Sequence, residues 1–503
     1  MHDKIYIELR NLYMVVLRSV CYDQNVGIGH GRAPVRQRNL YAKERLTMKK
    51  TLVLLGAGSA SFTISILKDL ILSEGLKDCT LRLVDIDESR LEEARRAAES
   101  YNTEAKTDIQ IEAYTDRRKA FCGADFVICA VKIGGYGPLE AERKIAEAHG
   151  YYRGIGDRVS CYFGGVGAYW QIRFLEEVAH DMEELCPDAW LVQTANPVFD
   201  GTNYLTRYTK VKAVGVCHGH FQAYTVADIM GLDRSKVTTE VVGFNHHIYL
   251  TDFRYEGKDA YPLLDQWIAE KSEAYWKSEA YNTPGEYGFV PEELTPGVID
   301  AYHLYGLLPI GDAIRSASPW WHHTDFATKE KWYGKNGGFD SEICWANYLH
   351  NKDIHHEKIR KTLDAGEPIT KVYPLEASGE QHIPLINAIA TDHYQRFTLN
   401  VPNNGCVPGI PDDVMVEIPV IASARGIQGI KMNPLPRRLM DNVIYPRMRT
   451  MNNLHEAYRN GDRSLLVLEL MHDHRTKSFE QAKDLIDDLL AQPWNVDADK
   501  HYR

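Results

Sequence analysis

A short apolar stretch, a glycine-rich turn and a helical pattern in succession constrain the fold of this chain more than any other feature. Residues 51–72 read TLVLLGAGSASFTISILKDLIL, and Leu67, Leu70 and Ile71 of the helical part fall on one face. Gly56 permits a tight turn, and Gly58 lets the backbone approach a pyrophosphate, which would also meet the N–H groups at the helix N-terminus. Ser61 replaces the third glycine of the usual motif. The stretch therefore predicts a dinucleotide site, with a similar sheet that binds no cofactor as the alternative.

Three later segments repeat the pattern of a strand that ends in loop residues. TLRLVDID ends near Asp85, ADFVICAVKIGG ends at Gly134, and AWLVQTANPV ends at Asn196. Strands that alternate with helices in this way predict a doubly wound, Rossmann-like sheet. Asp85 is suitably spaced to contact a ribose hydroxyl, and its charge would repel a 2′-phosphate, so NAD is favoured over NADP.

Charge and cysteine usage exclude several classes of protein. The 503 residues carry a formal net charge of −11 without a basic stretch in the main body, which argues against nucleic acid as a partner. No apolar run reaches the roughly 18 residues of a membrane helix. The nine cysteines are odd in number and scattered, as expected of reduced thiols in the cytoplasm. These features predict a cytoplasmic protein with a small-molecule substrate and no membrane partner.

The domain organisation is expected to have three parts. Residues 1–47 lack a convincing signal sequence and are interpreted as a disordered leader or a start-site extension. Residues 48–243 are predicted to form the NAD-binding domain, because Met48 directly precedes KKTLVLLGAG. Residues 244–503 are predicted to form a catalytic and oligomerisation domain.

A second feature is the stretch GVCHGHF at residues 215–221, followed later by GFNHH. Cys217, His218 and His246 each follow an expected strand on the side where α/β sheets bind ligands. A thiolate and one imidazole are too few for a structural zinc site, but they leave positions open for substrate oxygens, as a catalytic metal requires. Ordinary packing is the alternative for any single buried cysteine or histidine.

From about Lys49 to its end, the chain resembles glycoside hydrolase family 4, the NAD- and metal-dependent glycosidases. The α-glucosidase branch is the most similar. The resemblance implies an α/β fold like that of lactate and malate dehydrogenases, with the NAD-binding domain followed by an α+β catalytic domain. It also implies homodimers or homotetramers. The motifs that carry it are GAGSASF, VDID, YYRGI, ANPVFDGT, AVGVCHGHF, GFNHHIYL, LYGLLPIGDAIR, KWYG, GEQHIPLINAI and HDHRTKS.

Site residues can be carried over where the motifs match. The resemblance implies Cys217 and His246 as ligands of Mn²⁺ or another divalent metal, and Asp312 as the catalytic base. His218 occupies the position of an aspartate general acid in the phospho-glucosidase branch. The NAD-binding residues are expected to be Gly56, Gly58, Ser59, Asp85 and Gly134. The substrate-binding residues are expected to be Asn196, Asn245 and Arg315.

One position departs from the family pattern. The α-glucosidase branch has an aspartate in a VSDY context, where this chain has Cys161 in VSCY. Asp157 could compensate, or the acid role could pass to His218. Arg158 could meet a sugar carboxylate bidentately, which keeps a uronide substrate open, although a solvated loop arginine is the simpler interpretation.

The implied reaction begins with removal of a hydride from C3 of the sugar by NAD⁺. The resulting ketone acidifies the C2 proton, and the metal stabilises the enolate as a Lewis acid. Asp312 would take that proton, the C1–O bond would break by elimination, and water and hydride would then return. Because oxidation would remove the thiolate ligand, we expect activity to require reducing conditions.

Other interpretations remain open at this stage. The substrate could be an α-glucuronide or an α-galacturonide rather than an α-glucoside. The chain could also be an NAD-dependent 2-hydroxy-acid dehydrogenase, which would form net NADH without a metal, or a sensor that binds NAD without catalysis. Asp312 could simply cap a helix that begins at Ala313.

Several other polar or amphipathic stretches are interpreted as structural. The WWHH stretch at residues 320–323 and the pair His355 and His356 lie outside the matched motifs, and packing or surface exposure explains them. His382 could lie near the active site and is given no role. Residues 478–492 form an expected terminal amphipathic helix.

Overall fold

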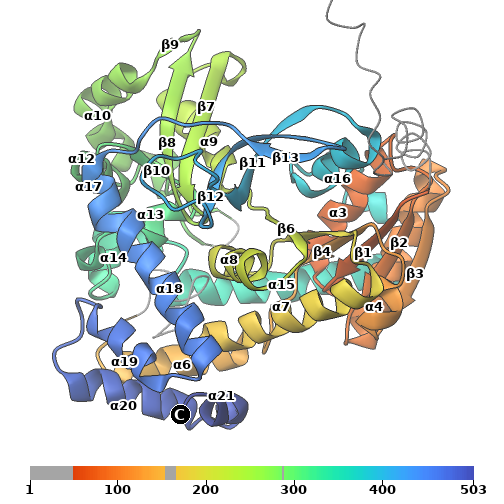
Figure 1. Ribbon diagram of the computed structural model, residues 1–503. Coiled ribbons are helices and arrows are strands. Elements are labelled where there is room, and N and C mark those ends of the chain that lie inside the picture. The colour runs from red at the N-terminus through yellow and green to blue at the C-terminus, as the bar shows by residue number, and fades with distance from the viewer. Residues whose placement is uncertain (1–48, 153–165, 286–287) are drawn as a thin grey trace, which may run out of the picture. The chain divides into compact units, whose positions relative to one another are not determined.

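The computed structural model describes residues 49–152, 166–285 and 288–503 (Figure 1). Its first half contains a parallel sheet in the strand order β3-β2-β1-β4-β5-β6. The strands are short, and the central strands β1 and β4 are apolar and buried, as expected of a sheet covered on both faces. Their bounds are β1 (Thr51–Leu55), β2 (Thr80–Val84), β3 (Gln110–Tyr114), β4 (Phe126–Cys129), β5 (Trp190–Gln193) and β6 (Lys212–Gly215).

Alternate side chains of β1 enter two different cores, so helices cover both faces of the parallel sheet. Leu52 and Leu54 pack with α3 (Ala60–Leu72) and α4 (Glu88–Ala105). Val53 and Leu55 pack with α7 (Val166–Leu185) on the other face. The predicted doubly wound sheet is therefore confirmed. The remaining helices of this half are α5 (Arg117–Phe121), α6 (Gly137–Ala148), α8 (Val198–Tyr208) and α9 (Gln222–Met230).

Antiparallel strands of the second half extend the same sheet beyond β6. The order continues as β11-β12-β7-β8-β10, with β13 paired to β12 and β9 paired to β8. Each of two joins consists of a single residue pair, Asn400 with Gly215 and Glu417 with Gly243. The bounds are β7 (Val237–Phe244), β8 (His247–Tyr255), β9 (Lys258–Asp259), β10 (Leu308–Ile310), β11 (Gln395–Pro402), β12 (Met415–Ser423) and β13 (Gly426–Gly429).

Helices of the second half surround these strands, and those at the C-terminus pack on the first half. A separate core joins α6 and α7 to α18, α19, α20 and α21. The expected amphipathic helix is confirmed as α20, and the short helix α21 follows it. The bounds are α10 (Tyr261–Trp276), α11 (Glu279–Asn282), α12 (Pro296–Tyr305), α13 (Ala313–Ser316), α14 (Phe326–Tyr333), α15 (Glu342–Asp364), α16 (His382–Thr391), α17 (Arg437–Leu439), α18 (Tyr445–Asn460), α19 (Arg463–Met471), α20 (Phe479–Leu490) and α21 (Val496–His501).

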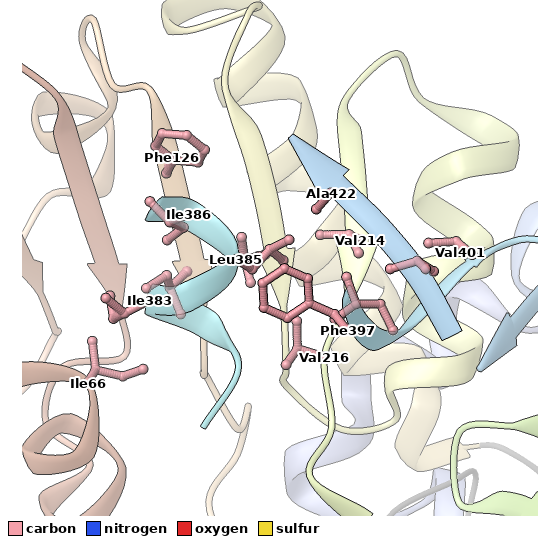
Figure 2. Packing of buried hydrophobic residues seen from close by; sticks show 14 of the residues in the cluster. Ile66, Phe126, Val214, Val216, Ile383, Leu385, Ile386, Phe397, Val401 and Ala422 are labelled. Carbon is pink, nitrogen blue, oxygen red and sulfur yellow. The ribbon is translucent and has the colours of Figure 1, made fainter. Parts of the chain in front are cut away.

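The largest core contains residues from both halves of the chain. Figure 2 shows Ile383 and Ile386 of α16 beside Ile66 of α3 and Phe126 of β4, with Phe397 of β11 next to them. All five side chains are at most 5% exposed. The two halves therefore share one hydrophobic core, and the predicted division after residue 243 remains a prediction.

Three observations bear on the remaining expectations. The strand β3 (Gln110–Tyr114) was not expected. Its residues are only partly buried at the sheet edge, so the sequence has no continuous apolar run there. The cysteines within the described parts are free thiols. Within those same parts, no helix is long and apolar enough to cross a membrane.

Candidate active site

One row of paired residues crosses the sheet and places the candidate site residues near one another. The row runs through Tyr114, Val84, Leu55, Cys129, Gln193, Gly215, Asn400, Glu417, Gly243, Ile248 and Ile310. Six residues with expected roles follow members of this row by one to three positions: Gly56, Asp85, Asn196, Cys217, His246 and Asp312.

The glycine-rich turn has the geometry of a dinucleotide site. Gly56 has φ +93°, and a Cβ added to Gly58 would lie 2.7 Å from Oδ2 of Asp85. The N–H of Gly58 donates to that oxygen at 2.7 Å. At the start of α3, the side chain of Ser59 makes no capping hydrogen bond, and the first turn contains no acidic residue. The helix N-terminus therefore suits an anionic ligand.

Two further loops lie at the same edge of the parallel sheet. Gly134 and Gly135 follow β4 with φ of +75° and +69°, and added Cβ atoms would meet no atom within 4 Å. Ile86, which the sequence analysis did not single out, is 92% exposed beside Asp85.

The two expected metal ligands come from two turns. Cys217 follows β6, and His246 lies in the two-residue turn between β7 and β8. His246 has φ +61°, a left-handed conformation that costs a residue with a side chain about 1 kcal/mol or more. This conformation places Nε2 of His246 3.2 Å from Oδ2 of Asp312.

A contact between two glycines brings the CHGH and PIGD segments together. A Cβ added to Gly311, which has φ +65°, would lie 2.8 Å from the Cα of Gly219. No larger residue fits at Gly311 without moving backbone. Asp312 is therefore held beside the turn that carries Cys217 and His218.

Asp312 does not act as a helix cap through its side chain. It occupies the N-cap position of α13 but makes no capping hydrogen bond there. Its carboxylate instead forms a salt bridge with Arg315. The Arg315 side chain is 9% exposed and also pairs with Glu292, while its Nε lies 3.6 Å from Oδ2 of Asp340. The predicted substrate contact of Arg315 remains a prediction, and its observed partners fix the position of Asp312.

A buried carboxylate supports the turn that carries His246. Glu417 is fully buried on β12, and its Oε2 accepts hydrogen bonds from Nδ2 of Asn245 at 3.0 Å and of Asn400 at 3.1 Å. Burial raises the pKa of Glu417 to about 7, against the opposing effect of these two hydrogen bonds. Burial also raises the pKa of the Cys217 thiol, and the negative charges of Glu417 and Asp312 raise it further by a smaller amount. A divalent metal would oppose this rise by stabilising the thiolate.

His218 has an acidic partner that the sequence analysis did not identify. Its Nδ1 lies 3.0 Å from Oε1 of Glu380, and this hydrogen bond raises the pKa of His218. Burial alone would raise the pKa of Glu380, but the hydrogen bond from His218, with His382 beside the other oxygen, holds it well below its usual range. The sequence signal for Glu380 was its place in the GEQH motif, and that for Glu417 was a lone charge in the apolar run MVEIPVIA.

Asn196 supplies a further polar atom at this edge. Its Oδ1 is buried and has no hydrogen-bond partner within the described residues, as expected of an acceptor that awaits a ligand. In the parts of the chain that the structure describes, no group of three or more His, Cys, Asp or Glu side chains could hold a metal. Cys217 and His246 would therefore leave coordination positions to substrate or water.

The other histidine pairs have packing partners, as expected. His322 and His323 are fully buried, and Nε2 of His322 lies 2.9 Å from Oδ2 of Asp300. The ring of His355 contacts Tyr373, and His356 lies 3.4 Å from Glu93. The alternative acid Asp157, the variant position Cys161 and Arg158 lie outside the described residues.

Comparison with known proteins gives matches over most of the chain. A model of family 4 glycosyl hydrolases matches residues 51–231, and a model of the C-terminal domain of that family matches residues 241–476. An α-galactosidase of Bacillus subtilis is 26% identical over 88% of this chain and 98% of its own. An α-glucosidase of Erwinia rhapontici is 26% identical over 89% and 99%. An α-galacturonidase of Thermoanaerobacterium saccharolyticum is 25% identical over 88% and 95%.

A solved structure has the same fold. It is a 6-phospho-α-glucosidase from gut microorganisms in complex with NAD and Mn²⁺, 18% identical, with a TM-score of 0.70. The similarity covers 88% of this chain and 98% of that one. The fold similarity therefore extends through both halves of the chain.

Proposed function

Because the chain belongs to glycoside hydrolase family 4, we propose that it hydrolyses α-glycosidic bonds with NAD and a divalent metal such as Mn²⁺ as cofactors. The observation that carries this proposal is the meeting of the Cys217, His246 and Asp312 segments, with His246 and Asp312 3.2 Å apart. Family membership decides against a 2-hydroxy-acid dehydrogenase. The proposed setting is the cytoplasm, and the proposed assembly is a homodimer or homotetramer.

The described residues fit both cofactors. NAD would lie against Gly56, Gly58 and the start of α3, with Asp85 at the ribose and Gly134 on the neighbouring loop. The metal would be held by Cys217 and His246, with Asn196 near it. When bound, NAD⁺ would supply a hydride acceptor for C3 of the sugar, and the metal would supply a Lewis acid that makes the C2 proton more acidic.

The chain's own residues would move the protons. Asp312, fixed by Arg315, would remove the proton from C2. His218 would protonate the leaving-group oxygen, because its side chain is 66% exposed while its partner Glu380 is 16% exposed. Asn245 would contact the substrate beside His246.

The experiment that tests the proposal measures nitrophenol release from α-glucoside, α-galactoside and α-galacturonide substrates. NAD⁺, Mn²⁺ and thiol are each omitted in turn after bound cofactor has been removed. We expect all three to be required, with no net NADH, and the preferred sugar decides between glucosidase, galactosidase and uronidase. Turnover that survives removal of NAD⁺ and metal would contradict the proposal.

Two variants separate the roles of the site residues. Cys217→Ser is expected to weaken Mn²⁺ binding by 10-fold or more, on the order of magnitude for lost metal contacts, while NAD⁺ affinity stays unchanged. Asp312→Asn is expected to lower kcat by roughly 10²–10⁴-fold and to slow exchange of the C2 proton with solvent deuterium. A Cys217→Ser variant with unchanged Mn²⁺ affinity would remove Cys217 from the ligand set.

A further inference from the structure

The Glu380–Gln381 segment lies along the turn that carries Cys217 and His218. Nε2 of Gln381 donates to the carbonyl oxygen of Cys217 at 3.2 Å and to that of Thr398 at 2.7 Å. Oε1 of Gln381 accepts from the N–H of Thr398 at 2.9 Å. Gln381 therefore joins the turn to β11, and the neighbouring Glu380 is placed beside the His218 ring.

The carboxylate of Glu380 is itself held in place. The backbone N–H of Glu380 donates to Oγ of Ser378 at 3.0 Å, and the N–H of Ser378 donates to Asp69 of α3 at 2.7 Å. Nδ1 of His382 lies 3.5 Å from Oε2 of Glu380, and the His382 ring packs edge-on against Phe62 of α3 at 5.2 Å. Contacts from α3 thus hold the backbone of this segment, and His382 of α16 lies beside the carboxylate oxygen of Glu380 that does not meet His218.

This arrangement decides which nitrogen of His218 is free. An ionised carboxylate can only accept hydrogen bonds, so Nδ1 of His218 must be the donor in the 3.0 Å contact. The other ring nitrogen, Nε2, then remains for a substrate, because a hydrogen bond at one nitrogen sets the role of the other. The side chain of His218 is 66% exposed, whereas that of Glu380 is 16% exposed. Of the two groups, the imidazole is therefore the one that a substrate can reach.

We propose that Glu380 is a positioning residue that fixes the His218 ring so that Nε2 faces the leaving-group oxygen. This inference rests on the proposed function, which gives His218 the role of general acid. In the proton transfer, the His218 ring with a proton on both nitrogens would give its Nε2 proton to the departing oxygen as the C1–O bond breaks. This leaves the neutral ring with its proton on Nδ1 and Glu380 still ionised. A simple ion pair at an exposed site would instead contribute little stability and no preference among substrates.

The first test compares Glu380→Gln with Glu240→Gln, which removes a carboxylate paired with Arg396 on β11. Poor leaving groups need the acid, whereas dinitrophenolate departs without protonation. For Glu380→Gln we expect kcat/KM to fall by roughly 10²-fold on a methyl or sugar α-glycoside and by less than about 3-fold on the dinitrophenyl glycoside. The Glu240→Gln control should keep the wild-type kcat/KM on both substrates. Equal effects of Glu380→Gln on both substrates would overturn the proposal.

A second test does not depend on turnover. With ¹⁵N-histidine labelling, the His218 signal is identified by its loss in His218→Asn. In the wild type we expect a proton on Nδ1, and in Glu380→Gln a mixture of ring forms, with Mn²⁺ and NAD⁺ affinities unchanged. An unaltered His218 signal in the variant would refute the positioning role. If the wild type cleaved no α-glycoside, the proposed function would fail while this measurement would still decide the role of Glu380.

Discussion

Gly311 shows how a single missing side chain holds the candidate site together. For Gly311→Ala we expect destabilisation of about 3 kcal/mol, from the left-handed backbone and from contact with the Gly219 backbone. A displaced Asp312 should also lower kcat roughly 10²-fold. Gly306→Ala is the matched control, since Gly306 has φ +84° but open space around it, and it should cost only about 1 kcal/mol. Urea unfolding measures the stability of both variants, and steady-state kinetics measures kcat. Equal losses of unfolding free energy in the two variants would contradict a close contact between Gly311 and Gly219.

His455 provides a pH prediction at the same scale. Burial lowers the pKa of this histidine to about 4, and Nε2 donates to the carbonyl oxygen of Asp200 at 3.0 Å. Because the folded-state pKa lies below the usual value near 6.5, the unfolded chain binds more protons between these values. The contribution of neutral His455 to the free energy of unfolding is therefore complete above about pH 6.5. It is lost as the pH falls towards 4, and the loss is on the order of 3 kcal/mol.

The measurement is the free energy of unfolding of the wild type and of His455→Gln at several pH values. We expect the difference between the two proteins to shrink as the pH is lowered from 7 to 4. Other histidines, among them His220 and His322, also have lowered pKa values, and taking the difference between the two proteins removes their effect. A difference that stays constant with pH would show that folding leaves the pKa of His455 unchanged.

At the residue scale, the sequence identified the candidate metal ligands and the candidate catalytic base, but not the residues that hold them in place. Cys217, His246 and Asp312 stand in short motifs after strands, where chemistry and position can both be read. Glu380 and Glu417 act across 162 and 172 positions of sequence, through pairings that only the folded sheet creates. No local pattern distinguishes such a carboxylate from an ordinary charged residue.

At the scale of elements, a buried ion pair joins α18 to α8. Nη1 of Arg447 lies 3.1 Å from Oδ1 of Asp200, and the two side chains are 7% and 0% exposed. Arg447→Met would leave a buried charge unpaired, so we expect a loss of about 3–5 kcal/mol in unfolding free energy. Since α8 begins just after Asn196 and Pro197, KM should rise as well.

The control for this prediction is Arg437→Met, which removes an exposed partner of Asp441. Exposed pairs contribute about 0–1 kcal/mol, so this variant should unfold at nearly the wild-type urea concentration. If Arg447→Met were equally mild, the pair would not stabilise the contact between the two helices.

Elements with strong local signals were the predictable ones. The glycine-rich turn, α3 and α20 agree with the sequence patterns, because apolar spacing defines them without long-range contacts. The edge strand β3 was missed, since its pairing with β2 and not its own composition makes it a strand. The joining of β6 to β11 was also unpredictable, because it depends on one residue pair between distant segments.

At the scale of the whole molecule, the continuous sheet predicts that residues 49–503 unfold in one transition. NAD⁺ at about 100 times its Kd should stabilise the folded state by about 2.7 kcal/mol. Hydrogen exchange in β8 and α10, which lie far along the chain from the glycine-rich turn, should slow with that in β1. Protection confined to the first half would contradict a single cooperative unit.

Truncation tests the same idea. A chain that ends at Gly243 would lose β11 beside β6 and α16 beside α3, together with their share of the core in Figure 2. We expect it to be unfolded or aggregated by circular dichroism and gel filtration. A monomeric, NAD-binding fragment would instead establish an independent first domain.

The row of paired residues that crosses the sheet also constrains how the gene can change in length. Inserting or deleting a single codon within β11 or β12 would turn Asn400 or Glu417 to the opposite face of the sheet, and the turn that carries His246 would lose its support. Residues 403–414, which join these strands, do not alternate between two sheet faces. Their exposed residues 408–409 and 411–413 can change in number more readily than the buried Val407, Ile410 and Val414. Among descendants of a common ancestor, length variation should therefore accumulate in that connection, while the two strands should change only by substitution.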